Sequence, residues 1–204
     1  MSRPRNVAIL IFDDVELLDF CGPLEVFSVT GRQDDITPFN VYTVAEKLDP
    51  ITTRNQLSVN PQYTIHDCPQ PDILLVPGGQ GTRREMNNPT LVNWIKDCSQ
   101  KTQLILSVCT GALLLAKAGL LEGLTATTHH SAIELLKEIA PNINIQTDKR
   151  FVDNGRIILS AGISAGIDMS LYVVAKLLGK EQALKTARYM EYNWRIPSPL
   201  GGEG

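Results

Sequence analysis

A single cysteine stands where a predicted buried strand meets a predicted helix. The apolar run over residues 104–108 ends at Cys109, and an Ala/Leu-rich run begins directly after it. A sharp junction of this kind lifts a side chain clear of the sheet, and the free N–H groups and dipole of the helix favour a thiolate there. We interpret Cys109 as a candidate nucleophile at a cysteine nucleophile elbow, with a buried structural cysteine as the alternative.

A nucleophilic thiol also needs hydrogen-bond donors for the negative charge that develops on its substrate. The Thr110 N–H, at the start of the helix, is one candidate donor. Gly78 and Gly79 follow the predicted strand over residues 72–76, and their backbone can approach a ligand closely because glycine has no Cβ. An ordinary turn is the alternative interpretation of this Pro-Gly-Gly sequence.

Acidic residues gather after the first predicted strand, at Asp13, Asp14, Glu16 and Asp19. Asp19 lies between apolar residues on either side, and a carboxyl group in such surroundings has a raised pKa. Asp19 is therefore our candidate proton donor to the thiol. A helix-capping aspartate is the alternative, and Asp13 and Asp14 are expected only to favour the helix dipole.

Two further groups are secondary candidates. His129 and His130 follow a short predicted strand, and a histidine beside a cysteine can activate it, although such a pair also occurs at solvated helix starts. Cys21, two residues after Asp19, is a possible partner for a reversible disulfide with Cys109 under oxidation.

The expected elements bring the candidate loops to one edge of a sheet. Apolar runs predict buried strands over residues 6–12, 39–44, 72–76 and 104–108. Helices are expected over residues 16–30, 89–101, 130–139, 164–178 and 180–192, with a break in the first at Gly22-Pro23. This alternation predicts an α/β fold, doubly wound and flavodoxin-like, with a mainly parallel sheet sandwiched by helices. Sites in such folds form beyond the carboxyl ends of the strands.

Composition is that of a soluble globular protein. Of 204 residues, 43% are hydrophobic and 20% charged, so we expect one domain over residues 1–196 and an irregular tail over 197–204. The net charge of −3, without a basic run, predicts no nucleic-acid partner, and no run approaches the roughly 18 apolar residues of a membrane span. Four cysteines without CxxC spacing, and no secretory signal, predict a cytoplasmic protein with no metal and no other cofactor.

Five ordered blocks resemble the ThiJ/PfpI superfamily, which shares the class I glutamine-amidotransferase-like fold. They span residues 12–27, 76–79, 108–112, 126–129 and 161–168, and the isonitrile hydratase-like branch is the most similar. The resemblance implies a catalytic Cys109 paired with Asp19, and backbone N–H donors at Gly79 and Thr110. It also implies a pocket that can include Gly78, His129 and Ile163.

The implied activity is hydration of an isonitrile to an N-substituted formamide through a thioimidate on Cys109. The alternatives are a stress or redox-sensing protein, or a glyoxalase, deglycase or amidase activity at the same cysteine. Thr110 stands where protease-like members have histidine, which argues against a peptidase. Regulators in the superfamily carry an added helix-turn-helix module, for which we expect no room here. The expected partners are a small-molecule substrate and, from the habit of the family, a second copy in a homodimer.

Overall fold

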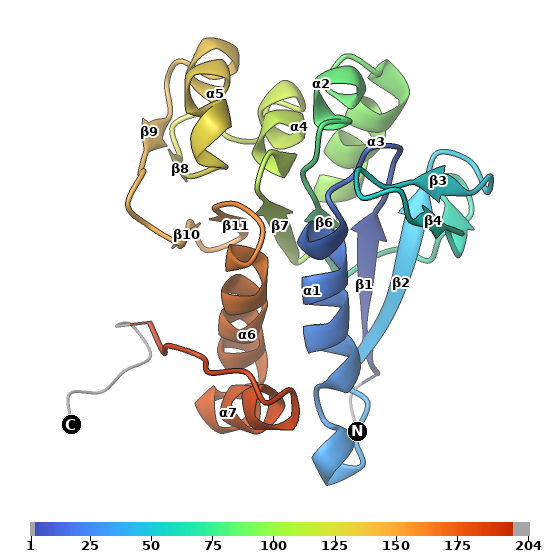
Figure 1. The fold of residues 1–204 in the computed structure, drawn as a ribbon, viewed down its shortest axis with the longest axis vertical. Coiled ribbons are helices and arrows are strands. Elements are labelled where there is room, and N and C mark those ends of the chain that lie inside the picture. The colour runs from blue at the N-terminus through green and yellow to red at the C-terminus, as the bar shows by residue number, and fades with distance from the viewer. Residues whose placement is uncertain (1–2, 198–204) are drawn as a thin grey trace.

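Seven strands form one central sheet in the computed structural model, which describes residues 3–197. Their order is β10-β11-β7-β6-β1-β2-β5 (Figure 1), and every neighbouring pair is parallel except β10 with β11. The bounds are β1 Arg5–Leu10, β2 Phe39–Ala45, β5 Tyr63–Thr64, β6 Ile73–Val76, β7 Leu104–Val108, β10 Phe151–Asp153 and β11 Ile157–Ser160. Two small sheets pair β3 (Ile51–Thr52) with β4 (Ser58–Val59), and β8 (Thr125–Ala126) with β9 (Asn144–Ile145).

Helices cover both faces of the central sheet (Figure 1). One layer holds three helices in mutual contact, α1 Leu17–Val29, α6 Ala165–Leu178 and α7 Lys180–Tyr189. The other layer consists of α2 Thr82–Glu85, α3 Pro89–Ser99, α4 Gly111–Lys117 and α5 Ile133–Ile139. In this layer α4 contacts each of the other three helices. Right-handed crossovers explain the two layers, because the connection β1–β2 and the connection β6–β7 run toward opposite edges of the sheet. The expected doubly wound α/β fold is confirmed. Apart from Pro197, the tail expected over residues 197–204 lies outside the described residues.

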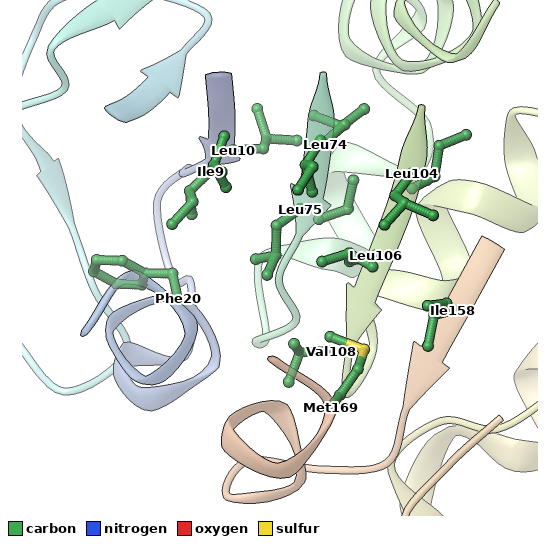
Figure 2. Close-up of a cluster of buried hydrophobic side chains, with 14 of the residues drawn as sticks. Ile9, Leu10, Phe20, Leu74, Leu75, Leu104, Leu106, Val108, Ile158 and Met169 are labelled. Atoms are coloured by element: carbon green, nitrogen blue, oxygen red, sulfur yellow. The ribbon is translucent and has the colours of Figure 1, made fainter. Parts of the chain in front are cut away.

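The core surrounds the middle strands. Every residue of β6 and β7 is buried, as the continuous apolar runs of parallel strands require. Ile9 of β1, Leu75 of β6 and Leu106 of β7 are neighbours in register (Figure 2). Complete burial of each such side chain contributes roughly 1.5–3 kcal/mol to stability. This packing holds three strand ends firmly in place, directly before the loops that carry the candidate residues.

The break expected at Gly22-Pro23 is wrong, because α1 continues through both residues. Proline removes one N–H from the helix, but packing between α1 and α6 outweighs that loss. Gly22 allows the close approach: a Cβ there would lie 2.9 Å from Cγ1 of Ile167 in α6. The pair therefore serves helix packing and does not end the helix.

Candidate active site

The loops after β1, β6 and β7 meet at the carboxyl edge of the sheet. Gly79 forms an isolated β-bridge with Val15, and the Glu16 N–H donates to the Gly78 carbonyl at 2.9 Å. The three strands are adjacent in the sheet, so their carboxyl ends deliver these loops to one place. The structure thereby brings Asp19, Gly78 and Cys109 together.

Cys109 lies at a strained turn between β7 and α4. Its φ is +57°, a left-handed value that is uncommon for a residue with a Cβ. Its N–H lies 3.2 Å from the carbonyl oxygens of both Ser160 and Ala161, and its carbonyl accepts the Thr128 hydroxyl at 2.8 Å. Strain of this kind costs on the order of 1–3 kcal/mol and persists only where the surroundings hold it. The turn has the backbone conformation expected of a nucleophile elbow.

Asp19 lies beneath this elbow and is fully buried. Its Oδ2 accepts the Gly78 N–H at 3.1 Å, whereas Oδ1 has no aligned hydrogen bond within the described part of the chain. Burial raises the pKa of Asp19 to about 7, although the nearby Cys109 thiol and Ile163 amide act in the opposite direction. The carboxyl pKa therefore shifts in the direction expected from the apolar neighbours of Asp19.

The Cys109 thiol does not have the lowered pKa that its position at a helix start led us to expect. Burial, followed by the charge of Asp19, raises the pKa of Cys109 to about 12, because only 5% of the residue is exposed. The Thr110 and Ile163 amides favour the thiolate, but their effect on the pKa is smaller. The two acids interact, so their titrations are coupled, and Asp19 loses its proton at lower pH than Cys109 does.

The Gly79 N–H, which we expected to serve as the second donor to the substrate, is bonded to the Thr110 hydroxyl. Oγ1 of Thr110 accepts the Gly79 N–H at 2.9 Å and lies 3.1 Å from Oγ1 of Thr82. Gly78 allows the tight fit, since a Cβ there would lie 2.5 Å from the Thr110 nitrogen and 2.8 Å from Oδ2 of Asp19. The Gly78 and Gly79 amides therefore both serve internal bonds in this structure.

His129 lies at the rim of the site and is neutral. Its Nδ1 accepts the Ser131 N–H at 3.3 Å and lies 2.8 Å from the Ser131 hydroxyl, so this network assigns the ring proton to Nε2. Partial burial lowers the pKa of His129, and electrostatic interactions with His130, Arg83 and Arg54 lower it further, whereas Glu16 acts in the opposite direction. The ring packs against Gly162, where a Cβ would lie 2.3 Å from His129 Cδ2.

A cavity of about 170 Å³ opens onto Cys109. Predicted residues in its wall are Gly79, Cys109, Thr110, His129 and Ile163; the others are Glu16, Arg54, Gln80, Arg83 and Ser131. Ile163 has φ +51°, a strained value for a β-branched residue. Sequence reasoning missed Arg54 and Arg83 as site residues, because only the folded chain brings the β3–β4 loop and α2 to this rim.

A larger cavity, of about 880 Å³, lies away from these loops. Its wall includes Arg150, Asp168 and Tyr192. The Asp168 carboxylate accepts hydrogen bonds from Nε of Arg150 at 2.5 Å and from the Tyr192 hydroxyl at 3.0 Å. No cysteine or histidine lines it. Cys109 and the adjacent buried Asp19 therefore favour the smaller cavity as the candidate active site.

Among residues 3–197, no group of three or more His, Cys, Asp or Glu side chains could hold a metal ion. No helix within that range is long and apolar enough to cross a membrane. All four cysteines are free; Cys21 is half-buried in α1, and its disulfide with Cys109 stays a prediction.

Comparisons with known proteins agree with the fold and with the resemblance seen in the sequence. The DJ-1/PfpI family matches residues 5–176. Isonitrile hydratase of Pseudomonas putida is 33% identical over 194 residues, which cover 95% of this chain and 80% of that protein. The transcriptional regulator CdhR of Pseudomonas aeruginosa is 32% identical over 179 residues, but this chain spans only 52% of its length. The crystal structure of a ThiJ/PfpI protein from Pseudomonas syringae superimposes with a TM-score of 0.84 and 30% identity, covering 98% of this chain and 80% of that one. The chain belongs to the DJ-1/PfpI family.

Proposed function

We propose that this protein is an isonitrile hydratase-like hydro-lyase, with Cys109 as nucleophile and Asp19 as acid. The observation that carries this proposal is the fully buried Asp19 carboxyl, with a pKa of about 7, paired with a thiol on a strained elbow. Proton transfer at neutral pH is most efficient from a group whose pKa lies near that pH. Similarity to the isonitrile hydratase of Pseudomonas putida supports the choice of substrate.

The first step uses the singly protonated pair. The Asp19 carboxylate takes the proton from Sγ of Cys109 as Sγ forms a bond to the terminal carbon of R–N≡C, and the same proton then moves from Asp19 to that carbon. The product is the thioimidate R–N=CH–S–Cys109, and Asp19 is left as a carboxylate. One proton and one negative charge are conserved.

Water completes the reaction. Its oxygen adds to the thioimidate carbon, and one of its protons reaches the nitrogen through Asp19, which gives R–NH–CH(OH)–S–Cys109. The C–S bond then breaks, the hydroxyl proton moves to Asp19, and the formamide R–NH–CHO dissociates. Asp19 and Cys109 again hold one proton, as they did at the start. The Thr110 and Ile163 amides already act on Sγ, and Gly79 joins them when the Thr110 hydroxyl turns away.

The experiment is incubation with benzyl isonitrile, with the formamide measured by NMR and the intact protein by mass spectrometry. We expect formamide from the wild type and none from Cys109→Ser. Asp19→Asn keeps the shape of the carboxyl without its proton, and its rate is expected to fall by about 100- to 10,000-fold. Formamide production by Cys109→Ser at the wild-type rate contradicts the mechanism.

Redox sensing at Cys109 draws less support from the site. A sensor cysteine oxidises readily when it is exposed and has a low pKa. Cys109 has neither property, because burial leaves 5% of the residue exposed and raises its pKa. Slow oxidation of Cys109 relative to the half-buried Cys21 under mild peroxide is therefore the expected result.

Assembly and location stay predictions drawn from the resemblance. We infer a cytoplasmic homodimer that acts on a small molecule and needs no cofactor. Sedimentation equilibrium of the purified chain tests the dimer directly, since a mass of 22.5 kDa contradicts it.

A further inference from the structure

Arg54 and Arg83 are two cations in the wall of the Cys109 cavity, and among the described residues neither is bonded to a carboxylate. Arg83 is half-buried in α2, and its Nη1 donates only to neutral oxygens, the Gly79 carbonyl at 3.3 Å and the Thr82 hydroxyl at 3.2 Å. Arg54 lies in the β3–β4 loop, and within residues 3–197 neither arginine forms an ion pair. The adjacent Arg84, by contrast, pairs with Glu85 at 2.7 Å.

Arg54 and Arg83 lie close enough to His129 to influence its pKa. His129 lines the same wall, and the positive charges of Arg83 and Arg54 lower its pKa, so the imidazole stays neutral. Glu16 is the one acidic residue in the wall. The rim therefore carries two positive charges against one negative charge, an excess that favours an anionic group on the ligand.

The direction of attack places that group at the rim. An isonitrile reacts at its terminal carbon, so this end must face Sγ of Cys109, and the substituent on nitrogen must point outward. The cavity is small, about 170 Å³, and seven of its ten wall residues have charged or polar side chains (Glu16, Arg54, Gln80, Arg83, Thr110, His129 and Ser131). Sites for neutral drug-sized ligands are larger and mainly apolar.

We propose that the site selects small isonitriles whose N-substituent carries a carboxylate, with Arg83 as its main partner and Arg54 as a second. This inference rests on the proposed hydratase function. A guanidinium group binds a carboxylate through two parallel charge-assisted hydrogen bonds, which adds specificity to charge attraction. Arg83 is the stronger partner because it is half-buried, whereas Arg54 is exposed and better screened by solvent.

The kinetic test compares isocyanoacetate with its methyl ester, which keeps the reactive group and removes the charge. The ratio of kcat/KM for the acid to that for the ester is expected to fall about 10- to 100-fold in Arg83→Gln. Arg188→Gln is the matched control, since it removes one positive charge from an exposed position in α7 and leaves the ratio unchanged. The ester reports any general damage to the site. An unchanged ratio in the Arg54→Gln/Arg83→Gln double variant overturns the proposal.

A second test does not depend on hydratase activity. Iodoacetate and iodoacetamide differ by the same charge, and their rates of reaction with Cys109 can be followed by peptide mass spectrometry. The iodoacetate-to-iodoacetamide ratio should fall about 10-fold or more in the double variant and stay constant in Arg188→Gln. If it falls while neither isonitrile is hydrated, the hydratase proposal fails and the anion subsite stands. If both isonitriles are hydrated and neither ratio falls, the subsite is overturned and the hydratase proposal stands.

Discussion

Burial raises the pKa of both Asp19 and Cys109, and the titrations of the two groups are coupled because they interact with each other. A helix start and two amides favour the thiolate, yet desolvation has the larger effect on the pKa of Cys109. In the proposed mechanism Asp19 takes the proton from the thiol as Sγ attacks, and it then passes that proton to the substrate.

The rate is expected to depend on pH through this pair. Since the reactive form holds one proton, kcat/KM should rise with pH up to about 7, the pKa of Asp19, and then level off. A pH profile on benzyl isonitrile measures this limb. Asp19→Asn should lose the limb along with most of its rate, and an identical limb in that variant would assign the titration to another group.

Thr110 contributes a hydroxyl that satisfies a buried amide. Replacing Thr110 by Val keeps the shape and leaves the Gly79 N–H without its partner, which should lower the free energy of unfolding by about 1–3 kcal/mol. Urea denaturation measures the loss. Thr110→Ser retains the hydroxyl and removes only the methyl group, so it is the control; a Thr110→Val variant as stable as the wild type would show that the hydrogen bond to Gly79 does not contribute to stability.

At the scale of elements, the site depends on how closely α4 approaches the end of β6. Gly111 begins α4, and a Cβ there would lie 2.0 Å from the Val76 carbonyl oxygen. The close approach holds the elbow of Cys109 against the loop that follows β6. The geometry of the site therefore depends on the packing of α4 against the end of β6 as well as on the strand ends.

Gly111→Ala is therefore expected to destabilise the protein by more than about 3 kcal/mol and to abolish activity, since a backbone atom has to move. Thermal unfolding and formamide production measure the two effects. Gly119→Ala is the matched control: Gly119 has φ +74° and open space around it, so only the cost of the left-handed backbone, about 1–2 kcal/mol, should appear. Similar losses in the two variants would contradict the role of Gly111.

For the whole molecule, burial of the Asp19 carboxyl lowers the free energy of unfolding at neutral pH. The pKa of Asp19 is about 7 in the folded chain against 3.8 for an unperturbed carboxyl, so the folded state binds its proton more tightly. The stabilisation from that proton is complete below about pH 4, declines as pH rises, and is lost above about pH 7. Asp19 therefore lowers stability at neutral pH, as is common for groups in active sites.

Asp19→Asn should become progressively more stable than the wild type as pH rises from 4 to 7, by an amount on the order of 4 kcal/mol. Urea unfolding of both proteins at several pH values gives the difference. Other carboxyl groups titrate in both proteins and cancel in that difference. Parallel stability curves would show that Asp19 keeps an ordinary pKa in the folded chain.

The amino-acid sequence by itself determined the four strands β1, β2, β6 and β7, most of the helices and the position of the turn at Cys109. Apolar runs and their spacing are local properties, and they predicted the doubly wound sheet and the cysteine after β7. The apolar flanks of Asp19 likewise predicted the direction of its pKa shift. Each of these features depends on residues near one another in the chain.

Only the tertiary structure decided the rest. Packing against α6 carried α1 through Pro23, burial raised the pKa of Cys109, and the Thr110 hydroxyl engaged the Gly79 amide. Folding also brought Arg54 and Arg83 to one rim from separate segments. Desolvation and contacts between distant residues set these features, and neither is encoded in the spacing of a single segment.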